Sequence, residues 1–152
     1  MAAKPIPDGY HSVTPYLAVK NAAEALAFYG KAFGAKELMR FDMPDGKIGH
    51  AEIRIGDSVV MLADEHPEMG CMAPAKSGAA GVSMLVYVED VDTRFAQAVK
   101  AGAKVQRTVQ DQFYGDRCGT LEDPFGHVWT LSTHKEDLSL DEIKQRMESM
   151  HA

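Results

Sequence analysis

The sequence predicts an α+β fold in which two β-α-β-β-β modules form curved mixed sheets with helices outside, followed by a C-terminal helix. The first reason is that an alternating apolar segment followed by an alanine-rich amphipathic stretch occurs twice. Thr14 aligns with Ser83 and Gly34 with Gly102, which are separations of 69 and 68 residues. The second reason is that a two-residue hydrophobic period follows each of these units, as in β-hairpins.

The first module is expected at about 10–64. Its opening segment, 12–19, alternates apolar and polar residues as a half-buried strand does. Asn21 and Glu24 then have capping-box spacing, apolar residues recur at helical intervals, and Gly34 ends the pattern. These signals predict a helix between Asn21 and Gly34.

The segment 48–63 of the first module predicts a hairpin with one polar face. Ala51, Ile53 and Ile55 fall on one side of the first strand, whereas His50 and Glu52 fall on the other. The Gly56-Asp57 pair is a turn signal, after which 58–63 forms the returning strand. The buried side of this hairpin is expected to cover the helix.

The second module is expected at about 81–134 and repeats these features. Asp90 can cap a helix that ends at Gly102. A second hairpin follows, with strands at 117–122 and 127–132 around the turn Asp123-Pro124-Phe125-Gly126. Strand alternation places Trp129 in the core.

Two segments lie outside the modules. Residues 65–80, rich in Gly, Ala, Pro and Met, are interpreted as a linker that is either mobile or folded over a pocket. Ser139 and Glu142 form a third capping-box pattern, which opens a C-terminal helix at about 139–150. Its narrow apolar stripe predicts that the helix covers another surface. The stripe consists of Leu140, Ile143, Met147 and Met150.

The repeated unit, the Phe28-Tyr29 pair, the Gly34-Ala35 stop and the segment Gly119–Trp129 resemble the vicinal oxygen chelate superfamily. That superfamily includes glyoxalase I, extradiol dioxygenases and fosfomycin- and bleomycin-resistance proteins. Residues 133–138 and the C-terminal helix are similar to its PhnB-like, glyoxalase/bleomycin resistance-like branch. The resemblance covers about 10–150 and implies that residues 1–152 form a single domain of this type.

The metal enzymes of this superfamily place one ligand, usually His, Glu or Gln, on each of four strands. The resemblance puts those positions at Thr14, Met61, Ser83 and Thr130. None of the four residues is an imidazole or carboxylate donor, of which a catalytic metal site needs about three, and hydroxyls with a thioether hold a divalent ion poorly against water. We therefore expect no metal and no other cofactor.

If those four residues face the cavity, strand alternation adds further side chains to a ligand-binding site. The expected set is mixed apolar, aromatic and polar, as in small-molecule pockets. Asp92, Asp111 and Asp116 are interpreted as solvated charges. The predicted ligand-binding residues are Thr14, Tyr16, His50, Glu52, Met61, Ser83, Leu85, Tyr87, Phe113, Tyr114, Arg117 and Thr130, with Phe113 and Tyr114 as a lid over a flat ligand.

Composition restricts the partners. The formal net charge is −6 and the basic residues are scattered, which argues against nucleic acid. No segment has the length and apolarity of a membrane span or the pattern of a signal peptide, so a cytoplasmic location with two reduced cysteines is expected. An exposed sheet and the apolar stripe of the last helix both need a cover, which predicts a homodimer.

Three functions remain open from the sequence. The favoured hypothesis is a metal-free protein that binds or sequesters a small amphipathic or aromatic molecule. The second is a metal-dependent lyase or dioxygenase-type enzyme with an unusual site near His50 and Glu52. The third is a dimeric regulatory or assembly module. Whether any reaction is catalysed, and at which residues, stays undecided.

Overall fold

The computed structural model describes residues 2–75 and 81–151 and contains two four-stranded sheets with the same topology. Their strand orders are β1-β4-β3-β2 and β5-β8-β7-β6. In the first sheet β1 pairs with β4 in parallel, and in the second sheet β5 pairs with β8 in parallel. All other neighbouring strands are antiparallel. The predicted α+β fold of two modules is confirmed.

The elements follow the expected order along the chain. The first module contains β1 (Tyr16–Val19), α1 (Ala22–Phe33), β2 (Lys36–Asp42), β3 (Ile48–Ile55) and β4 (Ser58–Asp64). The second contains β5 (Met84–Tyr87), α2 (Val91–Ala101), β6 (Lys104–Asp111), β7 (Asp116–Glu122) and β8 (Val128–His134). The C-terminal helix is α3 (Leu140–Met150).

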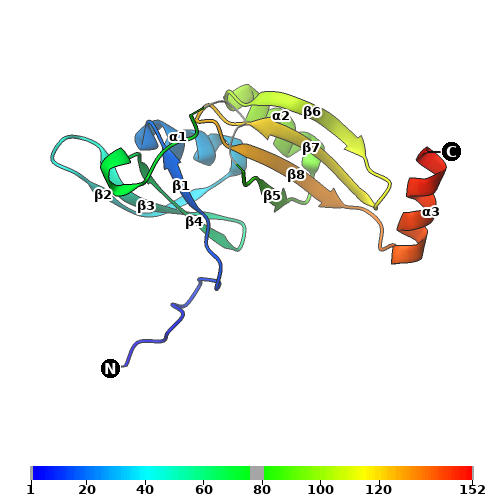
Figure 1. Ribbon diagram of the computed structural model, residues 1–152, viewed down its shortest axis with the longest axis horizontal. Helices are drawn as coiled ribbons and strands as arrows, with labels where there is room; N and C mark the ends of the chain where they lie inside the picture. Colours follow the sequence, from blue (N-terminus) through cyan, green and yellow to red (C-terminus); the bar gives the residue numbers. More distant parts are fainter. Residues whose placement is uncertain (1, 76–80, 152) are drawn as a thin grey trace.

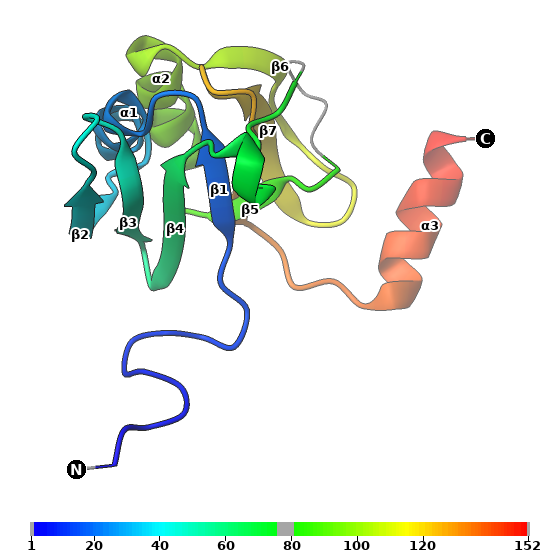
Figure 2. The same ribbon diagram turned by 60° about the vertical axis from the view of Figure 1, so that its left-hand side comes forward.

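The two sheets lie side by side, and α1 and α2 lie next to each other on one face of the sheets (Figure 1). Helix α3 stands apart at the end of the molecule beyond β7 and β8, and it remains separate when the view is turned (Figure 2). The face of each sheet that points away from α1 and α2 is called the open face below.

The same local interactions fix the helix of each module. The side chains of Asn21 and Asp90 cap α1 and α2. The first backbone N–H of α1, at Ala22, donates to Asp64 Oδ1 at 2.9 Å. At the equivalent place in the second module, the N–H of Val91 donates to Thr133 Oγ1 at 3.0 Å. Each helix start is therefore bound to the end of the last strand of its own module.

Strand alternation places the core between the sheets and the two helices, as predicted. Leu17, Ile53 and Leu62 from the first sheet are buried there, together with Leu121 and Leu131 from the second. Aromatic side chains join the modules at the centre, because the rings of Phe33 in α1 and Trp129 in β8 have centroids only 4.6 Å apart. The core position predicted for Trp129 is therefore correct.

The turn before β8 also connects the modules through one buried carboxylate. Asp123 Oδ2 accepts hydrogen bonds from the hydroxyl of Tyr29 at 2.6 Å and from Trp129 Nε1 at 2.8 Å. Its Oδ1 accepts from the backbone N–H groups of Phe125 and His127. Asp123 thus closes the hairpin and holds a side chain of α1 in the other module.

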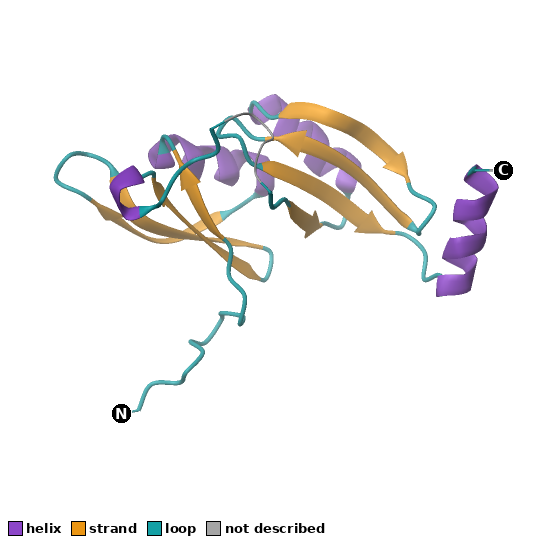
Figure 3. Cartoon of the chain, in the orientation of Figure 1, coloured by secondary structure: helices purple, strands orange, loops and turns teal. Residues whose placement is uncertain are grey.

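Two segments outside the sheets are the linker after β4 and the chain before β1. Residues 65–75 include a short 3₁₀ turn (Pro67–Met69) and a bridge between His66 and Cys71. The rest of the predicted linker, 76–80, lies outside the described residues. Residues 2–15, which precede β1, contain no helix or strand (Figure 3). No helix in 2–75 or 81–151 is both long and apolar enough to cross a membrane.

Candidate functional site

The predicted ligand-binding residues fall on two separate sheet faces within one chain. Tyr16, His50, Glu52 and Met61 lie on the open face of the first sheet, where the β1–β4 and β3–β4 registers place them next to one another. Leu85, Tyr87 and Thr130 lie on the open face of the second sheet. Ser83 directly precedes β5 and Thr14 lies two residues before β1, so neither belongs to a strand.

A chain of hydrogen bonds runs across the open face of the first sheet. The hydroxyl of Tyr16 lies 2.7 Å from His50 Nδ1, and His50 Nε2 lies 2.7 Å from Glu52 Oε2. The hydroxyl of Tyr10, from the segment before β1, donates to the other oxygen of Glu52. In the neutral imidazole, Nε2–H donates to the carboxylate and Nδ1 accepts from Tyr16. We call these four residues the Tyr-His-Glu relay.

The protonation states in the relay follow from burial and hydrogen bonding. Burial raises the pKa of Glu52, but the hydrogen bonds from His50 and Tyr10 outweigh this and leave that pKa below its ordinary value. The bond to Glu52 raises the pKa of Tyr10, and desolvation raises the pKa of Tyr16. At neutral pH the relay therefore contains one carboxylate, 6% exposed, and two protonated phenols.

The open face of the second sheet carries a second buried carboxylate, at Asp116. It accepts hydrogen bonds from Tyr87 at 3.3 Å and Ser132 at 3.2 Å, and it lies 2.7 Å from His134 Nδ1. The interpretation of Asp116 as a solvated charge is wrong, because the side chain is 7% exposed at the start of β7. The alternation of side chains in β7 and β8 could have identified Asp116 as a residue of the open face, opposite His134.

Phe113 and Tyr114, the residues predicted to form a lid, lie beside this face. The Tyr114 hydroxyl is 3.5 Å from Cys118 Sγ, and the rings of Phe113 and Tyr114 meet edge to face with centroids 5.2 Å apart. The hydrogen bond to Cys118 raises the pKa of Tyr114 to about 12. Both aromatic residues are therefore held at the β6–β7 loop by local contacts.

Arg117 does not share a wall with His50 and Glu52. It points to the helix side of β7, where its guanidinium binds both carboxylate oxygens of Asp92 at 2.8 and 2.9 Å, and it also contacts Asp111 at 3.2 Å. The prediction matched Arg117 to the polar face of the first hairpin. The turns of the two hairpins differ, and the registers make Thr120 the counterpart of Glu52, so Arg117 falls on the opposite face of its strand. Asp92 and Asp111, interpreted from the sequence as solvated charges, are exposed but form ion pairs with Arg117.

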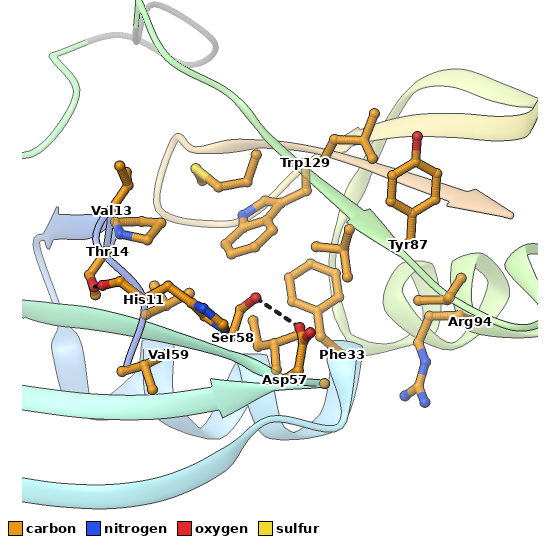
Figure 4. Close-up of a pocket in the computed structure, with 18 of the residues that line it drawn as sticks. His11, Val13, Thr14, Phe33, Asp57, Ser58, Val59, Tyr87, Arg94 and Trp129 are labelled. Carbon is orange, nitrogen blue, oxygen red and sulfur yellow. Dashed lines mark hydrogen bonds between the residues drawn. The ribbon is translucent and has the colours of Figure 1, made fainter. Parts of the chain in front are cut away.

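A cavity of about 880 Å³ opens between the two modules. Figure 4 shows Phe33 and Trp129 near the middle of its lining, with Asp57 and Ser58 of the β3–β4 turn on one side and Tyr87 on another. The sequence identified only three of the lining residues as binding residues. These are Thr14, Leu85 and Tyr87. The rest were missed because no local pattern shows which elements of the two modules meet.

The four positions that correspond to metal ligands do not fit a divalent ion. They carry two threonine hydroxyls, a serine hydroxyl and a thioether, and the hydroxyl of Thr130 is already 2.9 Å from that of Thr120. His50 and Glu52 use their facing atoms on each other, so that a metal would have to break the relay. Across 2–75 and 81–151, no three His, Cys, Asp or Glu side chains are grouped to hold an ion.

Comparisons with known proteins agree with this architecture. The model of the Glyoxalase/Bleomycin resistance protein/Dioxygenase superfamily matches residues 9–131. The uncharacterized protein Mb0911c of Mycobacterium bovis is 43% identical over 141 residues, covering 91% of this chain and 93% of its own. TioX from Micromonospora sp. ML1 has a similar crystal structure, with 26% identity, a TM-score of 0.63, and coverage of 85% of this chain and all of TioX.

A PhnB protein from Bacillus cereus, described as a putative 3-demethylubiquinone-9 3-methyltransferase, shares the fold. Its TM-score is 0.64 at 19% identity, and the match covers 81% of this chain and 99% of that protein. The similarity to the PhnB-like branch, inferred from residues 133–138 and the C-terminal helix, is thereby supported at the level of fold. The chain belongs to the Glyoxalase/Bleomycin resistance protein/Dioxygenase superfamily.

Proposed function

We propose that this protein binds a small amphipathic, partly aromatic molecule in the cavity between its modules. The observation that carries the proposal is the make-up of that cavity. The middle of its lining is apolar and aromatic, with Phe33 and Trp129, while Asp57, Asp90 and Arg94 bring charge to its rim. Cavities of several hundred Å³ with an apolar wall and few polar groups are typical of small-molecule sites.

The shape of this cavity favours a flat ligand with one or two polar groups. A ring that enters beside Tyr87, which is 63% exposed, would gain stacking of about 1 kcal/mol beyond the burial of its apolar area. Burial of the ligand contributes roughly 25 cal/mol per Å² before the cost of association is subtracted. Micromolar affinity is therefore the expected range.

Binding or sequestration is favoured over the hypothesis of a metal-dependent lyase or dioxygenase. A catalytic metal site of that kind requires about three imidazole or carboxylate donors and an open coordination position. His50 and Glu52 supply two donors, and both are engaged in the relay. The proposal therefore includes no metal and leaves the relay as a hydrogen-bonding group.

Two further properties belong to this proposal. We expect a homodimer, because the open faces of both sheets and the apolar stripe of α3 are exposed in one chain. A second copy could bring the open face of one sheet against that of the other and cover both.

We also expect a cytoplasmic location, which is consistent with the free thiols of Cys71 and Cys118.

Binding can be tested by titrating a panel of flat aromatic compounds against the fluorescence of Trp129, the single tryptophan of the chain. Tyr87→Ala removes an exposed ring from the cavity wall and should weaken binding about tenfold. Tyr114→Ala removes the same side chain from outside the cavity lining and is the matched control. If no compound binds, or if the two variants bind alike, the cavity is not the functional site and the assembly-module hypothesis gains.

A further inference from the structure

The chain before β1 leaves the body of the molecule as a loop (Figure 2). One of its side chains nevertheless contacts the first sheet. That side chain is Tyr10, whose hydroxyl donates a hydrogen bond to Glu52. The acceptor is a nearly buried carboxylate, whereas Tyr10 lies 42 residues away in the sequence. A hydrogen bond to a charged acceptor is stronger than one between neutral groups.

The place where Tyr10 ends has the features of a binding position for a phenol. Glu52 offers an ionised acceptor, and His50 keeps that carboxylate charged through its own hydrogen bond. Aromatic surface lies alongside, because the rings of Tyr16 and Phe41 have centroids 5.4 and 6.5 Å from the ring of His50. Tyr16 and Phe41 are 50% and 58% exposed, so their rings remain open to a further partner.

The same segment also forms part of the cavity between the modules. His11, Val13 and Thr14 line that cavity directly after Tyr10 in the chain. Val13 is 86% exposed and therefore adds little packing to hold the segment in place. The hydrogen bond of Tyr10 thus connects the relay on the sheet with the segment that forms one wall of the cavity.

We propose that Tyr10 is an internal occupant of a phenol-binding position made by Glu52, His50 and Tyr16, and that the protein takes phenolic ligands there when the N-terminal segment is displaced. The inference goes beyond the proposed function, because this position lies on the open face of the first sheet and none of its three residues lines the cavity. Tyr10 itself shows the mode of binding, with the ligand hydroxyl donating to Glu52 in its place. Loss of the hydroxyl from a ligand would leave the buried carboxylate short of one donor.

The energetic consequence is competition within one molecule. A ligand that needs Glu52 binds only the fraction of molecules in which Tyr10 is released, and its apparent Kd rises by the inverse of that fraction. Tyr10→Phe keeps the ring but removes the donor, so it should raise that fraction. We expect a phenolic ligand to bind this variant about tenfold more tightly than the wild type.

The test uses two matched probes on the full chain, 2-naphthol and 2-methoxynaphthalene, in which only the hydroxyl donor differs. Calorimetric titration is done with the wild type, Tyr10→Phe and Glu52→Gln. The expected result is tighter 2-naphthol binding by Tyr10→Phe, weaker binding by Glu52→Gln, and no change in 2-methoxynaphthalene binding for either. Phe113→Leu, at the far β6–β7 loop, is the control for loss of aromatic surface.

A second readout reports the displacement itself and does not depend on the stability of the Glu52 variant. Hydrogen exchange of residues 8–14 in the wild type should become faster on addition of 2-naphthol and stay constant with 2-methoxynaphthalene. If both probes bind equally and Tyr10→Phe alters neither, the proposed function stands and the phenol position is refuted. If neither probe binds any variant, both proposals fail.

Discussion

Single residues hold the two modules in their relative position, and Asp123 is the clearest case. Its carboxylate is 3% exposed and accepts four hydrogen bonds, two of them from the side chains of Tyr29 and Trp129. Because the modules meet at this carboxylate, a change there should affect stability more than a change at any exposed acid.

Asp123→Asn should lower the free energy of unfolding by about 3 kcal/mol, because an amide nitrogen would face two donors if the backbone bonds are kept. Urea unfolding measures the loss. Asp45→Asn is the control, since this exposed residue accepts one backbone bond that an asparagine retains, and its effect should stay within about 0.5 kcal/mol. Equal effects of the two changes would contradict the role given to Asp123.

Tyr29 leads to a pH-dependent prediction at the same site. Burial, followed by the negative charge and hydrogen bond of Asp123, raises the pKa of Tyr29 well above 10.0. A raised folded pKa means that the stabilising contribution is complete below the unfolded pKa and is lost as pH rises above it.

We therefore expect the wild type to lose stability from about pH 10 upward more steeply than Tyr29→Phe, which has no phenol to ionise. Melting temperatures of both proteins across pH 8–11 measure the difference in slope. Tyr87→Phe serves as the exposed control and should follow the wild type closely. Parallel slopes for the wild type and Tyr29→Phe would refute the prediction.

At the scale of elements, α3 is capped locally but packs on no other helix or strand within residues 2–75 and 81–151. Its capping box is formed, with Ser139 and Glu142 exchanging both hydrogen bonds. Arg146 connects it to Glu136 at 2.7 Å. Its apolar residues remain exposed, including Leu140 and Met150. An amphipathic helix gains most of its stability from the surface that it covers, so we assign α3 to the expected dimer contact.

Met147→Glu places a charge on this stripe and should shift the protein from dimer to monomer at micromolar concentration. Light scattering and sedimentation measure the change. Gln145→Glu adds the same charge to α3 away from the stripe and should leave the dimer intact. A wild type that is already monomeric, or a Met147→Glu dimer as stable as the wild type, would contradict the assignment.

At the scale of the whole molecule, the metal positions of the superfamily lead to a simple prediction. Thr14, Met61, Ser83 and Thr130 offer weak donors, and a ligand stabilises a protein only when it prefers the folded state. Zinc, nickel, manganese or ferrous ion should therefore leave the melting temperature unchanged within about 1 °C. A rise that depends on His50 and Glu52 would instead favour the metal-dependent reading.

The sequence by itself determined the modules, the helix limits and the buried faces of most strands. These features depend on local signals, namely capping residues, glycine stops and a hydrophobic period of two or 3.6 residues. Because the pattern repeats after 68–69 residues, an element recognised in one module also predicted its counterpart in the other. Trp129 was placed in the core on alternation alone, and its 1% exposure agrees.

Only the tertiary structure decided how the candidate site is assembled. The different turns of the two hairpins put Arg117 on the helix side, and no local pattern announced that α1 and α2 would pack together and leave a cavity beside Trp129. The contact of Tyr10 with Glu52 joins residues 42 positions apart. Such contacts depend on loop paths and on the packing of one module against the other, which hydrophobic periodicity does not encode.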